Sequence, residues 1–348
     1  MISASCVRNI DLPIRTVTPI LVVEGGITDE APPYTINLSY SGKFKNVYED
    51  SAARFVTDAR VSIKDDVGDT VSCQWIGLGT YQTSDSNFKG IIGRSYTLTV
   101  RLSNGKTYIS TPEKIQPVPP IDSISIFYDN SIGDVRPTQF IISANTSDPP
   151  GVKNYYRWQA YGYIPRKSIG DGCEPLGAPP AACHPYLCLC HALCEQLLRE
   201  DGINVFSDQY SNGRNIRQPV FYSPVYWHGK HFIEVRQESL NPDIYQYWVK
   251  YQEQQNRTGS ILDPLPSSLI GNIHNAADST DLGLGLFSAS AVYTKRFIIL
   301  PFFLQDYLLL GVATTWMLPG DCSFAFPDAL PDNTEPPGWE TAQLIELH

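Results

Sequence analysis

Cysteine and histidine side chains crowd one short stretch of the sequence, and these residue types bind metals, carry haem or form disulfides. Five of the eight cysteines fall here, namely Cys173, Cys183, Cys188, Cys190 and Cys194. Zinc sites usually use two close Cys or His pairs, but the spacing Cys-x9-Cys-x4-Cys-x-Cys-x3-Cys contains no Cys-x2-Cys pair. Cys188-Leu189-Cys190-His191 is one residue short of the haem-attachment motif. We expect no cofactor here, and three interpretations remain: disulfides, zinc or free thiols.

The other chemical motifs each lack a required residue. His228-Gly229-Lys230-His231 has no glutamate between its histidines, so it does not match a metalloprotease helix, and we expect exposed loop histidines. Ser288 and Ser290 lack the Gly-x-Ser-x-Gly elbow of serine hydrolases. Gly283-Leu284-Gly285 lacks the third glycine and the basic residue of a phosphate-binding loop. The sequence therefore favours a protein that is not an enzyme.

Two segments carry several oxygen ligands of the kind that calcium prefers, Asp65-Asp66-Val67-Gly68-Asp69 and Asp208 to Gly213. Neither segment matches the spacing of a calcium-binding loop. Asp, Asn and Gly are also the residues that turns require. We predict a turn at each segment and no metal site.

The composition is that of a strand-rich protein. Charged residues make up 18% of the 348 residues, whereas Pro (27), Gly (25) and Tyr (20) are plentiful, and turns and strands use these residues more than helices do. At roughly 150 residues per domain, the length predicts two domains. The net charge of −10 argues against an extended nucleic-acid interface, which needs clustered Lys and Arg.

Residues 19–120 predict an immunoglobulin-like antiparallel β-sandwich. Apolar residues alternate with polar ones at Ile36 to Tyr40, Val61 to Ile63, Val71 to Trp75 and Tyr96 to Leu102. Turn residues separate these segments, as at Asn104-Gly105. About seven short strands with such turns are typical of this fold. Consecutive prolines within 116–120 favour an extended linker at its end.

Residues 121–348 predict a larger β-rich domain with one or two helices and a cysteine-rich insert at 173–194. Strands are expected around Phe140 to Ala144, Tyr155 to Trp158 and Phe232 to Leu240. One helix is well signalled, because Asn241 suits the N-cap and Pro242 the first helical position. A weaker helix is predicted from about Pro185 to Glu200.

The N-terminal residues 1–18 are expected to form an anchor and a linker. The small residues Ser3-Ala4-Ser5 directly before Cys6 look like the end of a lipoprotein cleavage site, although an ordinary cysteine is the alternative. The longest apolar run, Phe297 to Leu304, is far shorter than the ~20 residues of a membrane helix.

Several motifs occur in a recognisable order along the chain. They are Cys6 with Ile10-Asp11-Leu12-Pro13, Leu21 to Asp29, Gly90 to Tyr96, Pro117 to Ile124, Phe206 to Arg214, Gly271-Asn272-Ile273, Leu284 to Ser290, and Asp321-Cys322 ahead of Trp339. In these motifs the chain resembles a Bacteroidota outer-membrane lipoprotein family catalogued as a domain of unknown function. Members are typically encoded beside SusC/SusD-like TonB-dependent transporters.

The resemblance implies a non-catalytic accessory protein of the outer membrane at the cell surface, anchored by lipid on Cys6. The implied partner is an outer-membrane β-barrel transporter of the SusC type or its complex, with no nucleic acid. The alternative is a free-standing surface lipoprotein that binds a glycan or a peptide.

An extracytoplasmic location favours disulfides over metals. With Cys6 lipidated and Cys73 taken as a small buried residue, six cysteines remain as disulfide candidates: Cys173, Cys183, Cys188, Cys190, Cys194 and Cys322. Their connectivity stays open among 15 pairings.

Aromatic residues form two dense runs that could make a binding surface. The candidates are Tyr155, Tyr156, Trp158, Tyr161, Tyr222, Tyr226 and Trp227. Aromatic residues with polar groups are enriched at interfaces. The competing interpretation, which we favour for most of them, is that they fill the core.

Overall fold

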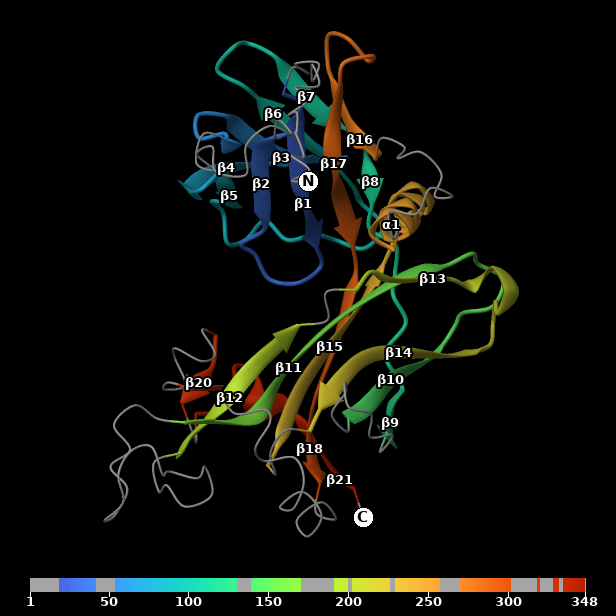
Figure 1. Cartoon of the computed structure of the whole chain (residues 1–348). Helices are drawn as coiled ribbons and strands as arrows, with labels where there is room; N and C mark the ends of the chain where they lie inside the picture. The colour runs from blue at the N-terminus through green and yellow to red at the C-terminus, as the bar shows by residue number, and fades with distance from the viewer. Residues whose placement is uncertain are drawn as a thin grey trace, which may run out of the picture. The chain divides into compact units, whose positions relative to one another are not determined.

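The computed structural model describes residues 19–41, 54–129, 139–169, 191–199, 202–225, 229–256, 269–301, 318–319, 328–331 and 334–347. Within these ranges the chain is mainly β, with one α-helix (Figure 1). It forms two compact units. The first contains the described residues of Met1–Lys114 and Leu265–Ala289, and the second those of Ile115–Pro264 and Ser290–His348.

The first unit is built from a single sheet that closes on itself in a barrel-like manner. Its strands are β1 (Leu21–Thr28), β2 (Thr35–Tyr40), β3 (Arg60–Asp65), β4 (Thr70–Gly77), β5 (Thr80–Thr83), β6 (Ser95–Arg101), β7 (Thr107–Ser110), β8 (Glu113–Lys114), β16 (Ile270–Asn275) and β17 (Leu282–Ser290). They pair in the order β3-β4-β5-β2-β1-β17-β16-β7-β6, with β8 beside β6. An additional pairing of β3 with β6 closes the ring.

Alternating apolar residues explain why these segments are strands. On β6, Tyr96, Leu98 and Val100 are each 1% exposed, whereas the residues between them are half-buried. The predicted Asn104-Gly105 turn joins β6 to β7, and Gly105 has a φ of 87°, which glycine adopts without strain. The strands predicted from 21 to 110 are therefore confirmed.

The immunoglobulin-like sandwich is not confirmed, because strands from later in the chain join this sheet. β17 lies between β1 and β16, and β16 pairs with β7. β17 approaches β1 so closely at Gly285 that a Cβ atom there would overlap the carbonyl oxygen of Val23. Residues 265–289, predicted within the C-terminal domain, thus complete the first unit.

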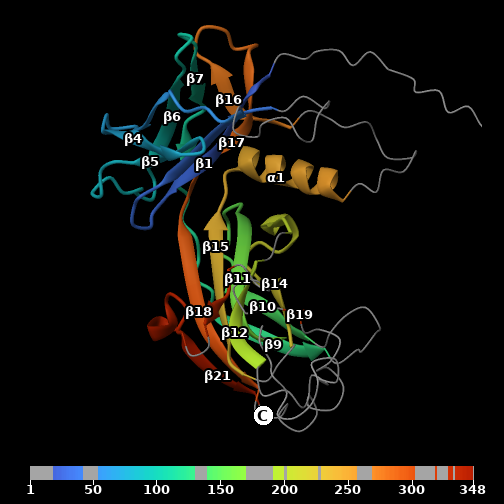
Figure 2. The same cartoon turned by 60° about the vertical axis from the view of Figure 1, so that its left-hand side comes forward.

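The second unit is a sandwich of two sheets. Its strands are β9 (Ser123–Asp129), β10 (Gln139–Ser147), β11 (Tyr155–Ile169), β12 (His191–Arg199), β13 (Asn204–Ser207), β14 (Asn215–Pro224), β15 (His231–Ser239), β18 (Val292–Pro301), β19 (Leu318–Pro319), β20 (Leu330–Pro331) and β21 (Gln343–Leu347). One sheet has the order β14-β10-β9 and the other β20-β12-β11-β15-β18-β21, with β13 and β19 on β11. Figure 2 shows β9, β10 and β14 as a separate layer beside β11, β15 and β18.

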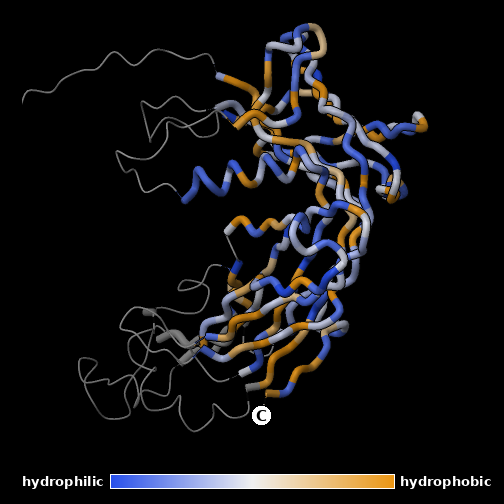
Figure 3. Tube along the Cα trace, turned by 90° about the vertical axis from the view of Figure 1, so that its right-hand side faces the viewer, coloured by the Kyte–Doolittle hydropathy of each residue, from blue (hydrophilic) through white to orange (hydrophobic). Residues whose placement is uncertain are grey.

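One hydrophobic core lies between these two sheets. It joins Phe140 and Ile142 of β10 to Trp158 of β11, Val235 of β15 and Phe297 of β18. Figure 3 shows hydrophobic and hydrophilic residues interspersed along the strands. Burial of such side chains is the main force that holds the two layers together.

The helix α1 (Pro242–Gln255) confirms the stronger helix prediction. Asn241 is its N-cap and Pro242 its first residue, where the missing proline N–H costs nothing. The helix is hydrophilic at its C-terminal end, where Gln252 to Gln255 lie (Figure 3). Two 3₁₀ helices, η3 (Asp208–Tyr210) and η5 (Trp339–Thr341), are also present. None of the described helices has the length and hydrophobicity needed to span a bilayer.

The weaker helix prediction, Pro185 to Glu200, is wrong for residues 191–199. These residues form β12, whose nine positions pair antiparallel with Tyr161 to Ile169 of β11. The long strand β11 pairs with the segment at all nine positions, so tertiary pairing outweighs local helix propensity. Residues 173–190 of the predicted cysteine-rich insert lie outside the described residues.

Candidate functional site

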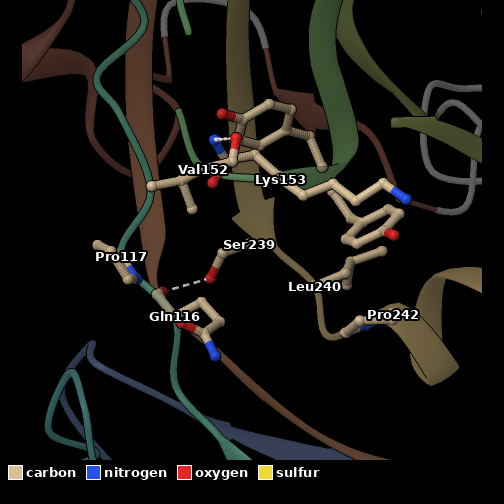
Figure 4. Close-up of a pocket in the computed structure, with 10 residues that line it drawn as sticks. Gln116, Pro117, Val152, Lys153, Ser239, Leu240 and Pro242 are labelled. Carbon is tan, nitrogen blue, oxygen red and sulfur yellow. Dashed lines mark hydrogen bonds between the residues drawn. The ribbon is translucent and has the colours of Figure 1, made fainter. Parts of the chain in front are cut away.

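A pocket of about 270 Å³ opens in the second unit at the turn from β10 to β11. It is bounded by this turn, the end of β15 and the start of α1. In Figure 4, Val152 and Pro117 lie on one side, Leu240 and Pro242 on the other, and Ser239 between them. The lining residues are Gln116, Pro117, Val152, Lys153, Asn154, Tyr155, Tyr156, Ser239, Leu240 and Pro242.

Two hydroxyl groups of the pocket are committed to hydrogen bonds with the protein. Ser239 Oγ donates to the Gln116 carbonyl oxygen at 2.6 Å and accepts from the Ala291 N–H at 3.0 Å. Tyr156 Oη donates to Asp148 Oδ1 at 2.5 Å. Burial first, and this bond to Asp148 second, raise the pKa of Tyr156 far above its usual value. The hydroxyls therefore hold the walls together.

The surface left to a ligand is mostly apolar, with one cationic group at its edge. Val152 is 58% exposed, and the exposed residues Pro117 and Pro242 add further apolar surface. Lys153 is exposed, with Nζ 6.0 Å from the centroid of the Tyr155 ring. The Tyr155 ring in turn packs on Tyr245 of α1 at 4.8 Å. Such a pocket suits an apolar side chain with a negative charge nearby.

The outer face of the larger sheet is polar and partly covered by α1. Arg157 of β11 lies 4.0 Å from the Trp248 ring centroid of α1 and 3.8 Å from Glu238. Burial lowers the pKa of Arg157, and Glu238 opposes that change. A cation between an aromatic ring and a carboxylate fastens α1 to this face.

A second ion pair lies farther along the same face. Arg296 Nε of β18 donates to Glu234 Oε2 of β15 at 2.6 Å. Tyr161 of β11 lies beside Glu234, and burial, with the negative charge of Glu234 next in importance, raises the pKa of Tyr161 to about 12. Tyr161 is therefore a neutral hydrogen-bond donor here.

The predicted aromatic surface is only partly a surface. Tyr156 and Trp158 are 0% and 2% exposed, so they are not part of a binding surface, and the core interpretation is correct for these two residues. They occupy the core-facing positions of β11, and Trp158 Nε1 donates to Gln237 Oε1 at 2.8 Å. Tyr155 and Tyr161 are half-buried on the opposite face.

The remaining aromatic candidates lie elsewhere. Tyr222 is 46% exposed on β14, in the other sheet. Tyr226 and Trp227 lie outside the described residues. The described candidates thus do not form one continuous patch, and Tyr155 is the only one of them that lines the pocket with an accessible ring.

Most of the cysteine candidates also lie outside the described residues, namely Cys6, Cys173, Cys183, Cys188, Cys190 and Cys322. Cys194 is on β12, where only the backbone is described. Cys73 on β4 has a free thiol and is half-buried. Burial raises the pKa of Cys73 to about 12, so its thiol stays protonated at neutral pH.

His231 is not the exposed loop histidine that its sequence context predicts. It is 0% exposed at the start of β15, and its Nδ1 lies 2.8 Å from Oγ of the equally buried Ser223. Burial lowers the pKa of His231 to about 3, so the ring is neutral. Alternation with Ile233 and Val235 was the signal that places it on the core face. The Ser–His pair has no access to solvent and is part of the core.

Among the described residues, no three His, Cys, Asp or Glu side chains gather as a metal cluster would require. No curated protein matches the sequence. Among solved structures, the chain is similar to one titled "Biofilm associated protein - BSP domain", with 8% identity and a TM-score of 0.19. The match covers 84% of this chain and 62% of that one, less than two thirds of its length, and a likeness this weak carries no argument.

The family comparison is the informative one. The model of the family described as "Domain of unknown function (DUF4249)" matches residues 7–296. This range includes β1 to β17, α1 and every residue that lines the pocket. Because the match extends over most of the chain, the protein belongs to the DUF4249 family.

Proposed function

We propose that this protein is a non-catalytic, lipid-anchored accessory protein of the outer membrane, and that its pocket receives a segment of a partner protein. The lipid anchor on Cys6, the cell-surface location and a SusC-like TonB-dependent transporter as partner are expectations from the resemblance described above. The single observation that supports a binding role is the lining of the pocket.

The lining favours binding over bond cleavage. None of its ten residues is an acid, a histidine or a cysteine, and the hydroxyls of Ser239 and Tyr156 are already hydrogen-bonded within the protein. A ligand meets mostly apolar area, together with the amino group of Lys153 and the side-chain amides of Gln116 and Asn154. Aromatic and aliphatic anchors that enter small pockets dominate the affinity of protein interfaces.

The proposal is tested by purifying the protein from gently solubilised outer membranes and identifying what co-elutes by mass spectrometry. We expect a transporter with the wild type and its loss with Val152→Arg, which places a charged side chain at the rim of the pocket. Phe127→Arg is the matched control, because Phe127 is 59% exposed in the same unit but does not line the pocket. Recovery of the wild-type protein alone contradicts the subunit proposal.

The volume of the pocket supports a second candidate, a free-standing binder of short peptides. At about 270 Å³ the pocket is at the small end of ligand sites, enough for one or two side chains and too small for an oligosaccharide. This candidate predicts that purified protein binds members of a peptide library without any partner, with Val152→Arg again abolishing binding. Failure of every peptide, together with co-elution of a transporter, favours the subunit.

We also propose that the six unlipidated cysteines other than Cys73 form three disulfides that act as local staples. Intact-mass measurement under alkylation, with and without reductant, counts the thiols that each treatment exposes. Alkylation of all the thiols without reductant excludes the disulfides.

A further inference from the structure

The two acidic turns singled out in the sequence contain buried carboxylates that are balanced in different ways. Asp65, in the turn between β3 and β4, is 5% exposed. Asp208, in the turn between β13 and β14, is 0% exposed. A buried carboxylate is costly unless hydrogen bonds and an opposite charge compensate it. The two turns therefore need separate accounts.

Asp65 is fully compensated by the protein. Its Oδ1 accepts from the backbone N–H groups of Val67, Gly68 and Asp69 at 3.2, 3.0 and 2.8 Å. Its Oδ2 pairs with Arg94 Nη1 at 2.7 Å. Both carboxylate oxygens have partners and the charge of Asp65 is paired with Arg94, so this turn requires no metal.

Asp208 is not compensated in this way. Its Oδ2 accepts from Asn212 Nδ2 at 3.0 Å, but its Oδ1 is buried without a hydrogen-bond partner among the described residues. Oγ of Ser211, in the same turn, is likewise buried without a described partner. Two buried oxygens without a described hydrogen-bond partner thus lie three residues apart in the sequence, and one of them belongs to the fully buried Asp208 carboxylate.

A second buried acid lies in the same network. Asp148 is 4% exposed, and its Oδ2 accepts from the Gly213 N–H at 2.9 Å, next to the Asn212 that binds Asp208. Its Oδ1 accepts from Tyr156 Oη at 2.5 Å and from Asn154 Nδ2 at 3.4 Å, so Asp148 has hydrogen bonds but no described cation beside it. The carbonyl oxygen of Val152 accepts from Asn212 and from Asn154. In the described part of the chain, no Lys, Arg or His forms an ion pair with either acid.

We infer that Asp208 and Asp148 bind a calcium ion, with Ser211 Oγ and main-chain carbonyl groups of the two turns as further ligands. Calcium takes six to eight oxygen ligands in flexible geometry, and carboxylate, hydroxyl and carbonyl oxygens are what this network offers. Magnesium demands stricter octahedral geometry and keeps several waters, so it fits a buried site of this kind less well.

Occupancy of this site bears on the pocket, because Val152 and Asn154 belong to both. Calcium at Asp208 and Asp148 holds the turn from β10 to β11 in place, and this turn forms one wall of the pocket. The inference does not rest on the proposed function, since metal binding is measured on the purified protein without a partner.

The test is a calcium titration of the full chain after removal of metals with a chelator. For a dissociation constant of about 10⁻⁴–10⁻³ M, about 10 mM CaCl₂ raises Tm by about 3–8 °C, and MgCl₂ raises it less. Isothermal titration calorimetry gives the stoichiometry, for which we expect one ion. A wild-type protein whose Tm and calorimetric trace do not respond to calcium overturns the inference.

Asp208→Asn supplies a sharper readout. Without calcium we expect this variant to melt at or above the wild-type Tm, because a buried uncompensated charge is gone. With calcium the order reverses, since only the wild type gains stability. Asp66→Asn, an exposed acid of the other turn, is the control and keeps the full calcium shift. If Asp208→Asn does not fold, Ser211→Ala replaces it, with an affinity loss of several-fold. An equal calcium shift in wild type and both variants contradicts the site.

Discussion

The buried histidine of the second unit makes stability depend on pH in a direction that can be calculated. His231 has a pKa of about 3 in the folded protein against 6.5 for the free side chain. Between these values the unfolded chain binds a proton that the folded chain does not, so stability falls as the pH falls below about 6.5. Each pH unit costs about 1.4 kcal/mol, so at about pH 5 the loss is about 2 kcal/mol.

The test compares the wild type with His231→Asn by urea unfolding, followed by tryptophan fluorescence, at about pH 7 and about pH 5. The asparagine amide takes the place of Nδ1 beside Ser223 but cannot gain a proton. At about pH 7 the variant is less stable by about 2–3 kcal/mol, because the packing of the ring against Phe140 is lost. At about pH 5 we expect this difference to shrink by about 2 kcal/mol.

A second histidine variant serves as the control for this experiment. His274→Asn removes a histidine from the first unit and should leave the pH dependence of the second unit unchanged. If wild type and His231→Asn lose stability in parallel between the two pH values, His231 does not contribute the calculated linkage and the reasoning is refuted.

Three further predictions concern the first unit. Gly285→Ala should lower the free energy of unfolding of this unit by about 2–3 kcal/mol in thermal melts, because φ is +80° and a Cβ atom would overlap the Val23 carbonyl oxygen. Gly68→Ala is the control and should cost only about 1 kcal/mol, because φ is +108° but a Cβ atom there would meet no other atom. Equal costs would argue against the close approach. Arg94→Met removes the ion-pair partner of buried Asp65 and should lower the free energy of unfolding by about 2 kcal/mol, a value that allows for the solvent exposure of Arg94. Lys106→Met breaks an exposed ion pair with Asp281 and should leave Tm unchanged. Cys73 should react with iodoacetamide at about pH 8 at least about 100-fold more slowly in the folded protein than in urea, because its pKa is raised to about 12. Peptide mass spectrometry measures the rate of alkylation, and similar rates in the folded and the urea-unfolded protein would contradict the prediction.

Local patterns in the sequence predict most of the individual strands and the main helix. The alternation of apolar and polar residues predicts the strand β6, because every second side chain from Tyr96 to Val100 is apolar and is buried in the core. The Asn241-Pro242 pair places the start of α1, because only the first helical position tolerates proline without loss. These signals act over a few residues, so no long-range information is needed to interpret them.

Pairing partners and burial are harder to predict, because they depend on residues far apart in the chain. Nothing in the local pattern of β1 indicates that β17 is its neighbour. The strand at 191–199 forms because β11 offers it a partner, and its own periodicity suggested a helix. The aromatic run from Tyr155 to Tyr163 predicts a strand, but it does not indicate which face of that strand packs against the other sheet. The sequence therefore leaves Tyr156 and Trp158 among the candidates for a binding surface, although they lie in the core.

The calcium inference shows the same limit at a finer scale. The two acidic turns are similar in composition, and only the positions of Arg94 and of the backbone N–H groups distinguish Asp65 from Asp208. The partners of a buried charge depend on the folded surroundings of the residue. The sequence alone therefore does not distinguish the two segments and predicts a turn at both.

The closed sheet has a consequence for how the protein is made. A ribosome delivers β1 to β8 first, but their ring lacks β16 and β17 until residue 290 has been synthesised. During that interval β1 and β7 are exposed edges able to pair with other chains. The first unit is thus completed only after residues 115–264 of the second unit have been synthesised. A chain that ends before residue 290 would carry two strand edges that are open to pairing with other chains.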